Sequence, residues 1–220
     1  MKHMDQKIIK FPHEKNLKDS DFFVSKSNKH VHDFLLSWPN WEKNLVNICG
    51  ENFSGKSHLI NIFIKKFKGV IFNADTFDDD DLSSLDIHQN IVLENLNNEI
   101  NEKLIYTLIN IVEQNDKYLI ITSYKSISEF NFNLDDLKSR AKNFLIQDIQ
   151  KPDDELIFAL LIKNLSDRQI TIEKKLVNYI VKRIHRSYSK IFDFIYKIDE
   201  MSLKKKKPIN INLVKEILGE

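Results

Sequence analysis

Eight consecutive residues have the types and the spacing of a phosphate-binding loop. They run from Gly50 to Ser57 and fit the pattern G-x-x-x-x-G-K-S. The glycines allow the backbone to curl so that its N–H groups point at phosphate oxygens. Lys56 supplies a positive charge to the outer phosphates, and Ser57 offers its hydroxyl to Mg²⁺. The sequence therefore predicts a site for ADP or ATP with Mg²⁺.

The elements around this loop are those that such a site requires. A short apolar run, Leu45 to Cys49, leads in as a buried strand, and a helix from Lys56 leads out with its positive dipole end towards the anion. We expect the nucleotide to be surrounded by the loop, by the residue after it and by one arginine further along the chain: Gly50, Glu51, Asn52, Phe53, Ser54, Gly55, Lys56, Ser57, His58 and Arg186.

A second acidic position is expected on a neighbouring strand, because hydrolysis at a P-loop needs a residue that orients Mg²⁺. The run Ile91 to Leu93 is followed by Glu94 and Asn95. Glu94 is the candidate metal residue together with Ser57. Asn95 occupies the place of a water-positioning acid, and an amide has no useful basicity. Hydrolysis is therefore predicted to be slow, and the chain is at most a weak ATPase; a plain strand end is the alternative.

Two further residues are candidates for contact with the terminal phosphate. Ser123 follows the strand that begins at Tyr118, where a polar sensor of the phosphate or a strand-terminating serine are both consistent with the sequence. Arg140 lies just before the last predicted strand, where an arginine finger would project towards a neighbouring subunit. An ordinary surface arginine is the alternative at that position.

Strands and helices alternate in the first two thirds of the chain, and only helices follow. Strands are predicted near residues 45–49, 70–72, 91–93, 118–122 and 144–146, with helices between them. Such alternation implies an α/β domain with a five-stranded, mostly parallel sheet. The chain therefore divides into an arm (1–20), a P-loop nucleotide-binding domain (21–150) and a small all-α lid domain (151–220).

Composition bounds the class of protein. The 220 residues are 42% hydrophobic and 30% charged, which excludes a mostly disordered chain. Residues 151–220 carry a net charge of +5 and residues 1–150 a net charge of −4. The aspartates of residues 73–89 are expected to form a solvated loop and a helix start, not a metal site. A single cysteine, no apolar leader and no apolar run of membrane length favour a cytoplasmic protein without membrane contact.

These features together resemble the DnaA family of replication initiators and its short Hda-like homologues, which regulate DnaA. The resemblance rests on residues 21–28, on Gly50 to Leu59, on Ile120 to Ser123 and on the helix that ends near Arg140. It also includes the C-terminal segments 198–203 and 208–211, which look like the end of an Hda lid. It implies an AAA+ fold and a regulator that docks on the DNA polymerase sliding clamp and promotes ATP hydrolysis by the initiator DnaA, with Arg140 acting in trans.

The chain departs from the family at two places. Glu94 stands where the family has aspartate, and Asn95 breaks the double-acid pattern of the initiator. The lid sensor arginine of the family aligns near Ser189 and Lys190, so its role is carried over to Arg186, one turn earlier. The chain ends at Glu220, after the predicted lid, so we expect no sequence-specific DNA binding of its own.

The N-terminal arm carries the expected partner contact. Residues 6–11 look like the clamp-binding peptide at the start of Hda proteins, which has glutamine first and large apolar residues at its fourth and sixth places. These are Gln6, Ile9 and Phe11, whereas Lys7 departs from the pattern. An arm that folds back on its own domain is the alternative. Three other questions stay open: a self-hydrolysing AAA+ ATPase of loader or motor type, a DNA-binding adaptor acting through the basic lid, and a homodimer.

Overall fold

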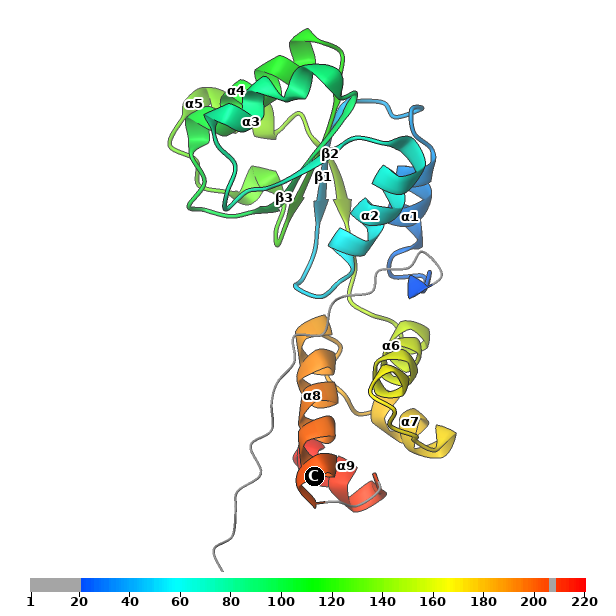
Figure 1. Cartoon of the computed structure of the whole chain (residues 1–220). Coiled ribbons are helices and arrows are strands. Elements are labelled where there is room, and N and C mark those ends of the chain that lie inside the picture. Colours follow the sequence, from blue (N-terminus) through cyan, green and yellow to red (C-terminus); the bar gives the residue numbers. More distant parts are fainter. Residues whose placement is uncertain (1–20, 206–208) are drawn as a thin grey trace, which may run out of the picture.

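A five-stranded sheet forms the centre of the upper unit in Figure 1, and a helical unit lies below it. The computed structural model describes residues 21–205 and 209–220. The predicted clamp peptide with Gln6, Ile9 and Phe11 lies outside these residues. The strands are β1 (Leu45–Cys49), β2 (Val70–Asn73), β3 (Asn90–Leu96), β4 (Tyr118–Ser123) and β5 (Leu145–Asp148).

The strand order places the phosphate-binding loop at a switch point of the sheet. The order is β2-β3-β4-β1-β5, and every neighbouring pair is parallel. The chain leaves β1 for the distant edge strand β2 and later returns to pair β5 with the other side of β1. In parallel sheets ligands bind beyond the carboxyl ends of the strands at such a point. The predicted fold class is confirmed, and the sheet is wholly parallel.

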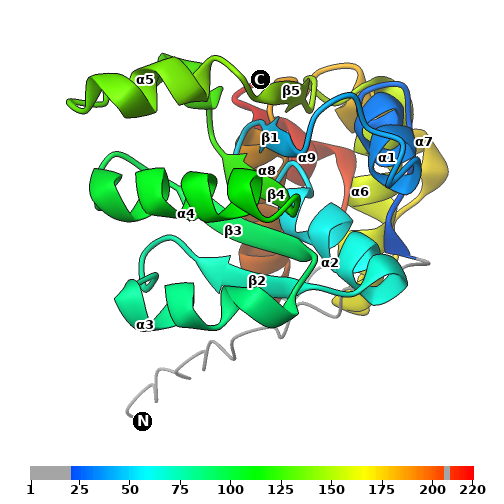
Figure 2. The same ribbon diagram turned by 90° about the horizontal axis from the view of Figure 1, so that it is seen from above.

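Alternate residues of each strand face opposite sides of the sheet, and each side has its own core. Leu45, Leu93 and Ile121 pack with helices α4 and α5, whereas Val46 and Ile120 pack with α1 and α2. Both faces are covered, as Figure 2 shows. The helices of this unit are α1 (Lys29–Leu36), α2 (Lys56–Phe67), α3 (Asp79–Ser83), α4 (Glu102–Gln114) and α5 (Asp135–Ala141), with short 3₁₀ turns η2 (Leu85–Ile87) and η3 (Ile127–Glu129).

The turn between α2 and β2 requires a glycine. Gly69 has a φ of +150°, and a Cβ atom there would lie 2.4 Å from the carbonyl oxygen of Asn90. The backbone of β3 therefore approaches the turn as closely as only glycine permits. This contact sets β2 beside β3 at the edge of the sheet.

Four helices make up the lower unit, which has a separate hydrophobic core. Ile157 and Leu161 of the first helix pack with Val177, Ile180 and Ile195 from the next two. The described lid helices are α6 (Asp154–Asp167), α7 (Lys174–Val181), α8 (Tyr188–Lys205) and α9 (Ile211–Leu218). A core of its own is what a small domain needs to fold as a unit.

Asp153 joins the two units at the start of α6. Its carboxylate accepts the backbone N–H of Leu156, which caps the helix, and also the hydroxyl of Ser27 at 2.8 Å. The N–H of Asp153 in turn donates to the Ser27 hydroxyl oxygen at 2.8 Å. The first turn of α6 is thereby tied to the segment that precedes α1. Within residues 21–205 and 209–220, no helix has the length and apolarity needed to cross a membrane.

Candidate nucleotide-binding site

The phosphate-binding loop follows β1 in a conformation that its glycines permit. Gly55 has a φ of +95° and Phe53 a φ of +68°, both in the left-handed region. A Cβ atom on Gly50 would lie 3.1 Å from the Cβ atom of Ile149, and one on Gly55 would lie 3.2 Å from the ring of Phe22. The curl of the loop therefore depends on residues without a side chain at both glycine positions.

Lys56 is held over this curl by the loop itself. Its ammonium group donates to the carbonyl oxygens of Gly50 at 2.7 Å and of Glu51 at 3.0 Å. Burial lowers the pKa of Lys56, whereas the neighbouring acidic groups of Cys49, Glu94 and Glu51 act in the opposite direction. Lys56 begins α2, so its charge and the amino end of that helix lie together. Both favour an anion at this place.

Two buried oxygen atoms at the site have no hydrogen-bond partner among the described residues. They are the hydroxyl oxygen of Ser54 in the loop and one carboxylate oxygen of Glu94 at the end of β3. Buried polar atoms without a partner are rare in folded proteins, and a bound ligand or ion is one explanation. An unpaired carboxylate close enough to act on Lys56 fits Mg²⁺, which takes few protein ligands and several waters at phosphate sites. The described residues hold no cluster of three or more His, Cys, Asp or Glu arranged for a metal.

Glu94 and Asn95 lie at an irregularity of the sheet. The pairing of β3 with β4 shifts register between Leu93 and Leu96, and Asn95 has a φ of +64°. The backbone N–H of Asn95 donates to the hydroxyl oxygen of Thr122 at 3.0 Å. A bulge re-aims the side chains beside it, and such bulges are common next to active sites. The predicted acidic position therefore lies at the carboxyl edge, in a strained segment held by a neighbouring strand.

Ser123 is buried, and its hydroxyl is engaged within the fold. It donates to the carbonyl oxygen of Lys125 at 2.6 Å and accepts from the side-chain amide of Asn47 at 2.8 Å. Asn47 also accepts the N–H of Ile127 at 2.8 Å. Ser123 thus shapes the turn after β4, and a sensor role stays a prediction. Sequence reasoning missed Asn47 and Thr122; the signal for Asn47 is one amide inside the apolar run of β1.

The side chains of the loop point in different directions. His58 packs edge-on against Phe22, with ring centroids 5.2 Å apart. Phe53, half-exposed at the tip of the loop, lies with its ring centroid 5.0 Å from that of Phe192 in α8. The carboxylate of Glu51 also reaches the lid, where it binds the amino end of α8. Two side chains of the loop, Glu51 and Phe53, therefore contact the lid.

Arg140 lies on the side of the sheet where the amino ends of the strands are. It forms an ion pair with Glu113 at the end of α4, and its guanidinium lies 5.3 Å from the centre of the Tyr106 ring. The carbonyl oxygen of Arg140 accepts from Asn143, whose own carbonyl oxygen accepts from Lys43 immediately before β1. Arg140 is therefore near the amino end of β1, and the phosphate-binding loop follows the carboxyl end of the same strand.

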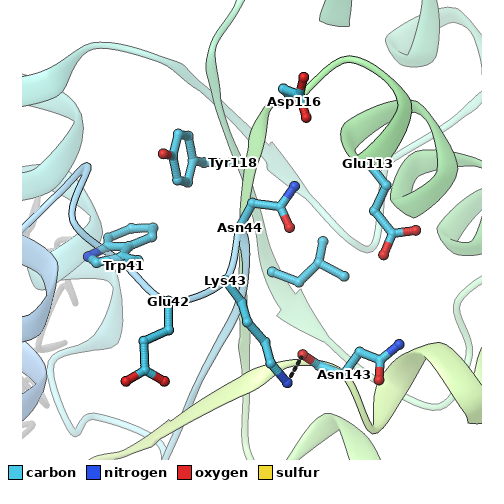
Figure 3. Close-up of a pocket in the computed structure, with 9 residues that line it drawn as sticks. Trp41, Glu42, Lys43, Asn44, Glu113, Asp116, Tyr118 and Asn143 are labelled. Carbon is cyan, nitrogen blue, oxygen red and sulfur yellow. Dashed lines mark hydrogen bonds between the residues drawn. The ribbon is translucent and has the colours of Figure 1, made fainter.

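A cavity of about 560 Å³ adjoins the ion pair of Arg140 and Glu113 (Figure 3). It lies between α4 and the amino ends of β1 and β4, and Trp41, Asn44, Asp116 and Tyr118 line it with Glu113. This cavity is on the side of the sheet away from the phosphate-binding loop. It is therefore a feature of the surface that carries Arg140, not of the nucleotide site.

Arg186 lies in the lid beside the junction of the two units. Its guanidinium pairs with Asp154 at 2.7 Å, and about half of its side chain is exposed. The sequence predicts that it folds back onto a nucleotide. The structure places it one residue before Ser187, which binds Glu51 of the loop, so it is close to the site but engaged with a carboxylate. Its contact with a nucleotide stays a prediction.

Known proteins resemble both units of the chain. Residues 153–218 match the family model described as the Hda lid domain. The chain is 27% identical over 185 residues to an uncharacterised protein of Haemophilus influenzae, covering 78% of this chain and 80% of that protein. It is 25% identical over 225 residues to the chromosomal replication initiator protein DnaA of Thermoanaerobacter sp. strain X514, covering 90% of this chain and 51% of that one. The chain thus spans about half the length of this DnaA.

A solved structure shows the same fold over nearly the whole chain. Domain III of the Thermotoga maritima DnaA superposes with a TM-score of 0.73 at 16% identity, covering 95% of this chain and 98% of that domain. The wholly parallel sheet, the loop after β1 and the helical lid are therefore the fold of that DnaA domain. The C-terminal unit is thus similar to the Hda lid domain, and the chain as a whole is similar to a part of DnaA.

Proposed function

We propose that this Hda-like protein is a nucleotide-bound regulator of replication initiation. In this proposal it binds ADP or ATP with Mg²⁺, docks on the DNA-loaded sliding clamp and promotes ATP hydrolysis by the initiator DnaA. Support for the nucleotide comes from the phosphate-binding loop, from the lysine held over it and from the unpaired Glu94 oxygen. Lys56 and the loop amides would hold the phosphates, and Ser57 and Glu94 would hold the metal ion, which neutralises phosphate charge when bound.

The position of Arg140 is the observation that carries the proposal. It lies at the amino ends of the strands, and β1 alone separates the two edges by about 16 Å at the usual rise per residue. An arginine there is too far from the nucleotide of its own chain to act on it. Its partly exposed side chain pairs with Glu113, which lines a neighbouring surface cavity, so a second subunit could reach it there. The proposed second subunit is DnaA with its bound ATP.

The residue that follows Glu94 supports a weak ATPase. Asn95 occupies the place where a general base or a water-positioning acid would stand, and an amide cannot accept the proton of water. Solo hydrolysis is therefore expected well below the roughly 1–100 s⁻¹ typical of phosphoryl-transfer enzymes. In the proposed complex, the hydrolysis that matters takes place on the partner.

A reconstituted assay tests the proposal. DnaA with ATP is mixed with clamp loaded on DNA, and phosphate release is measured with and without this protein. We expect release to depend on both this protein and the clamp. The double variant Ile9→Ala, Phe11→Ala should bind nucleotide normally, but its affinity for the clamp should fall by about two orders of magnitude. The reason is that burial of one such apolar side chain contributes roughly 1.5–3 kcal/mol.

The other outcomes of this assay identify the alternatives. Fast turnover without any partner would indicate a loader- or motor-type ATPase. Retention on DNA without clamp would indicate an adaptor that binds through its basic lid. Loss of thermal stability in the double variant with clamp affinity intact would show that the arm belongs to the fold, and the clamp contact would be withdrawn.

A further inference from the structure

The carboxylate of Glu51 leaves the phosphate-binding loop and binds the first turn of α8. It accepts the backbone N–H of Tyr188 at 3.0 Å and of Ser189 at 3.2 Å. It also accepts the hydroxyl of Ser189 at 2.9 Å and the hydroxyl of Ser187. Four donors from three consecutive lid residues therefore converge on one side chain of the loop.

This contact has a clear physical basis. The first N–H groups of a helix have no partner within the helix, and the helix dipole makes that end positive. A carboxylate satisfies both the donors and the charge. Burial by itself raises the pKa of Glu51, but the hydrogen bonds of Ser187, Ser189 and Tyr188 outweigh it, and the pKa lies below its ordinary value. Glu51 is therefore ionised at neutral pH, in the form that binds α8 most strongly.

Other contacts fix the same turn of α8 to the α/β unit. Tyr188 is only 1% exposed and packs in the core beneath α1 and α2, and its hydroxyl donates to the carbonyl oxygen of Gln150 at 3.1 Å. Phe53, two residues after Glu51, lies with its ring centroid 5.0 Å from that of Phe192 in α8. The lid therefore meets the loop through a carboxylate and an aromatic pair, and it meets the core through a buried tyrosine.

The cations of the lid near this turn are engaged elsewhere. Arg186 pairs with Asp154, and the ammonium group of Lys190 lies 3.9 Å from Asp193. Both pairs are within the lid. The end of α8 that faces the loop thus presents amides and hydroxyls that already bind a carboxylate of the protein, rather than a cation that awaits a phosphate.

We infer that Glu51 is a positioning residue that holds the lid on the phosphate-binding loop without help from a nucleotide. This inference depends on protein contacts alone, so it can fail or hold independently of the proposed nucleotide site.

Distances between spin labels test the inference on the full chain. Labels are attached to cysteines introduced at Lys103 in α4 and Lys197 in α8, two exposed positions of different units. The native Cys49 is buried, and burial raises the pKa of its thiol to about 12, so it should not compete for the reagent. We expect one narrow distance distribution for the protein without nucleotide.

Removal of the carboxylate should release the lid. In Glu51→Ala the distribution should widen, and hydrogen exchange at the amides of Tyr188 and Ser189 should become at least about tenfold faster. Glu51→Gln still accepts hydrogen bonds but lacks the charge. Its distance distribution and exchange rates should lie between those of Glu51→Ala and those of the wild type. Glu99→Ala removes an exposed carboxylate of the same unit and should change nothing.

Two results would overturn the inference. A broad distance distribution in the wild type without nucleotide would show that the lid is not held in one position. Wild-type distances and exchange in Glu51→Ala would show that the carboxylate does not hold the lid; if that variant fails to fold, the double variant Ser187→Ala, Ser189→Ala decides the same point with the loop intact. Calorimetry of the labelled protein with ADP runs in parallel: absence of binding would refute the proposed nucleotide site, and the Glu51 variants would still decide the lid contact.

Discussion

Lys56 lies at the carboxyl ends of the parallel strands and Arg140 at their amino ends, and the two cations have different partners. We call these two sides of the sheet the carboxyl edge and the amino edge. At the carboxyl edge, the ammonium of Lys56 is held by two backbone carbonyl oxygens, and the nearby Glu94 keeps one carboxylate oxygen unpaired. At the amino edge, the guanidinium of Arg140 is paired with the carboxylate of Glu113 and lies over the ring of Tyr106. One cation is only weakly neutralised, and the other has a full counter-charge.

This difference affects how each of the two cations would bind a phosphate group. Neutral carbonyl groups leave the charge of Lys56 available, so an anion can bind without displacing a protein carboxylate. In the proposed function, Arg140 would have to exchange Glu113 for the phosphate of a partner, so its action would depend on contact with that partner. The proposal thus assigns the carboxyl edge to a ligand that binds the isolated protein, and the amino edge to an assembly.

The largest expected effect comes from removal of Arg140 at the amino edge. Arg140→Ala should reduce the stimulation of DnaA hydrolysis by about 10³-fold or more, the usual contribution of an arginine finger supplied in trans. Affinity for ADP should stay at the wild-type value, because Arg140 is remote from the loop. Phosphate release with loaded clamp measures the first effect and calorimetry the second. Lys142→Ala, an exposed cation two residues further on, is the control, and equal loss in both variants would contradict a specific role for Arg140.

The next effect breaks the carboxyl edge. Lys56→Ala should weaken binding of ADP by about tenfold to a hundredfold, since a charge-assisted contact with phosphate is worth roughly 1.5–3 kcal/mol. The empty protein should keep its melting temperature within a few degrees, because Lys56 lies over the loop and not in the core. Calorimetric titration with ADP is the measurement, with Lys66→Ala in α2 as the matched control. Unchanged affinity would refute the phosphate site.

A third change sharpens the interpretation of the carboxyl edge. Asn95→Asp restores an acid at the bulge, where the backbone N–H bond to Thr122 already fixes the position. Solo ATP turnover should rise about tenfold, a modest part of the usual 10²–10⁴-fold contribution of a general base. Steady-state phosphate release reports the change, and Asn98→Asp, an exposed position three residues further along, serves as the control. No rise would mean that the slow step does not involve a base at this position.

A smaller effect sharpens the interpretation of the amino edge. Glu113→Gln keeps a hydrogen-bonding group beside Arg140 but removes the counter-charge, so release of the arginine to a partner becomes easier. Stimulation of DnaA should increase up to about fivefold, in keeping with the 0–1 kcal/mol that partly exposed ion pairs contribute. The same phosphate-release assay measures it. A decrease would show that Glu113 orients Arg140 for its action and does not restrain it.

The smallest effect concerns the dependence of stability on pH. Burial raises the pKa of Glu51, but its hydrogen bonds to Ser187, Ser189 and Tyr188 bring the pKa below the ordinary 4.5. A carboxyl group with a lowered folded-state pKa contributes stability above its unfolded pKa, and the contribution is lost as the pH falls through the folded value. Between about pH 5 and pH 3, the wild type should therefore lose more melting temperature than Glu51→Gln does. Parallel melting curves would contradict the role of this contact.

Most of the fold was predictable because its signals are local. The apolar runs of β1, β3 and β4 and the helices between them follow directly from the pattern of side chains, and their alternation implies a parallel sheet. The phosphate-binding loop was predictable for the same reason, since all its residues are contiguous. By contrast, the bulge at Asn95 and the hydrogen bonds of Asn47 depend on which strands become neighbours, and no local pattern specifies that.

By itself, the sequence determined the loop where phosphate binding is proposed and the strand and helix on either side of it, because glycine, lysine and serine at fixed spacing act through their own backbone and a helix end. Only the tertiary structure decided what the flanking charges do. Glu51 and Ser187 are 136 residues apart, and Glu113 and Arg140 are 27 apart, so neither contact leaves a trace in local spacing. Packing of the lid on the loop and of α5 beside α4 brings each pair together, and side-chain charge then selects the partner.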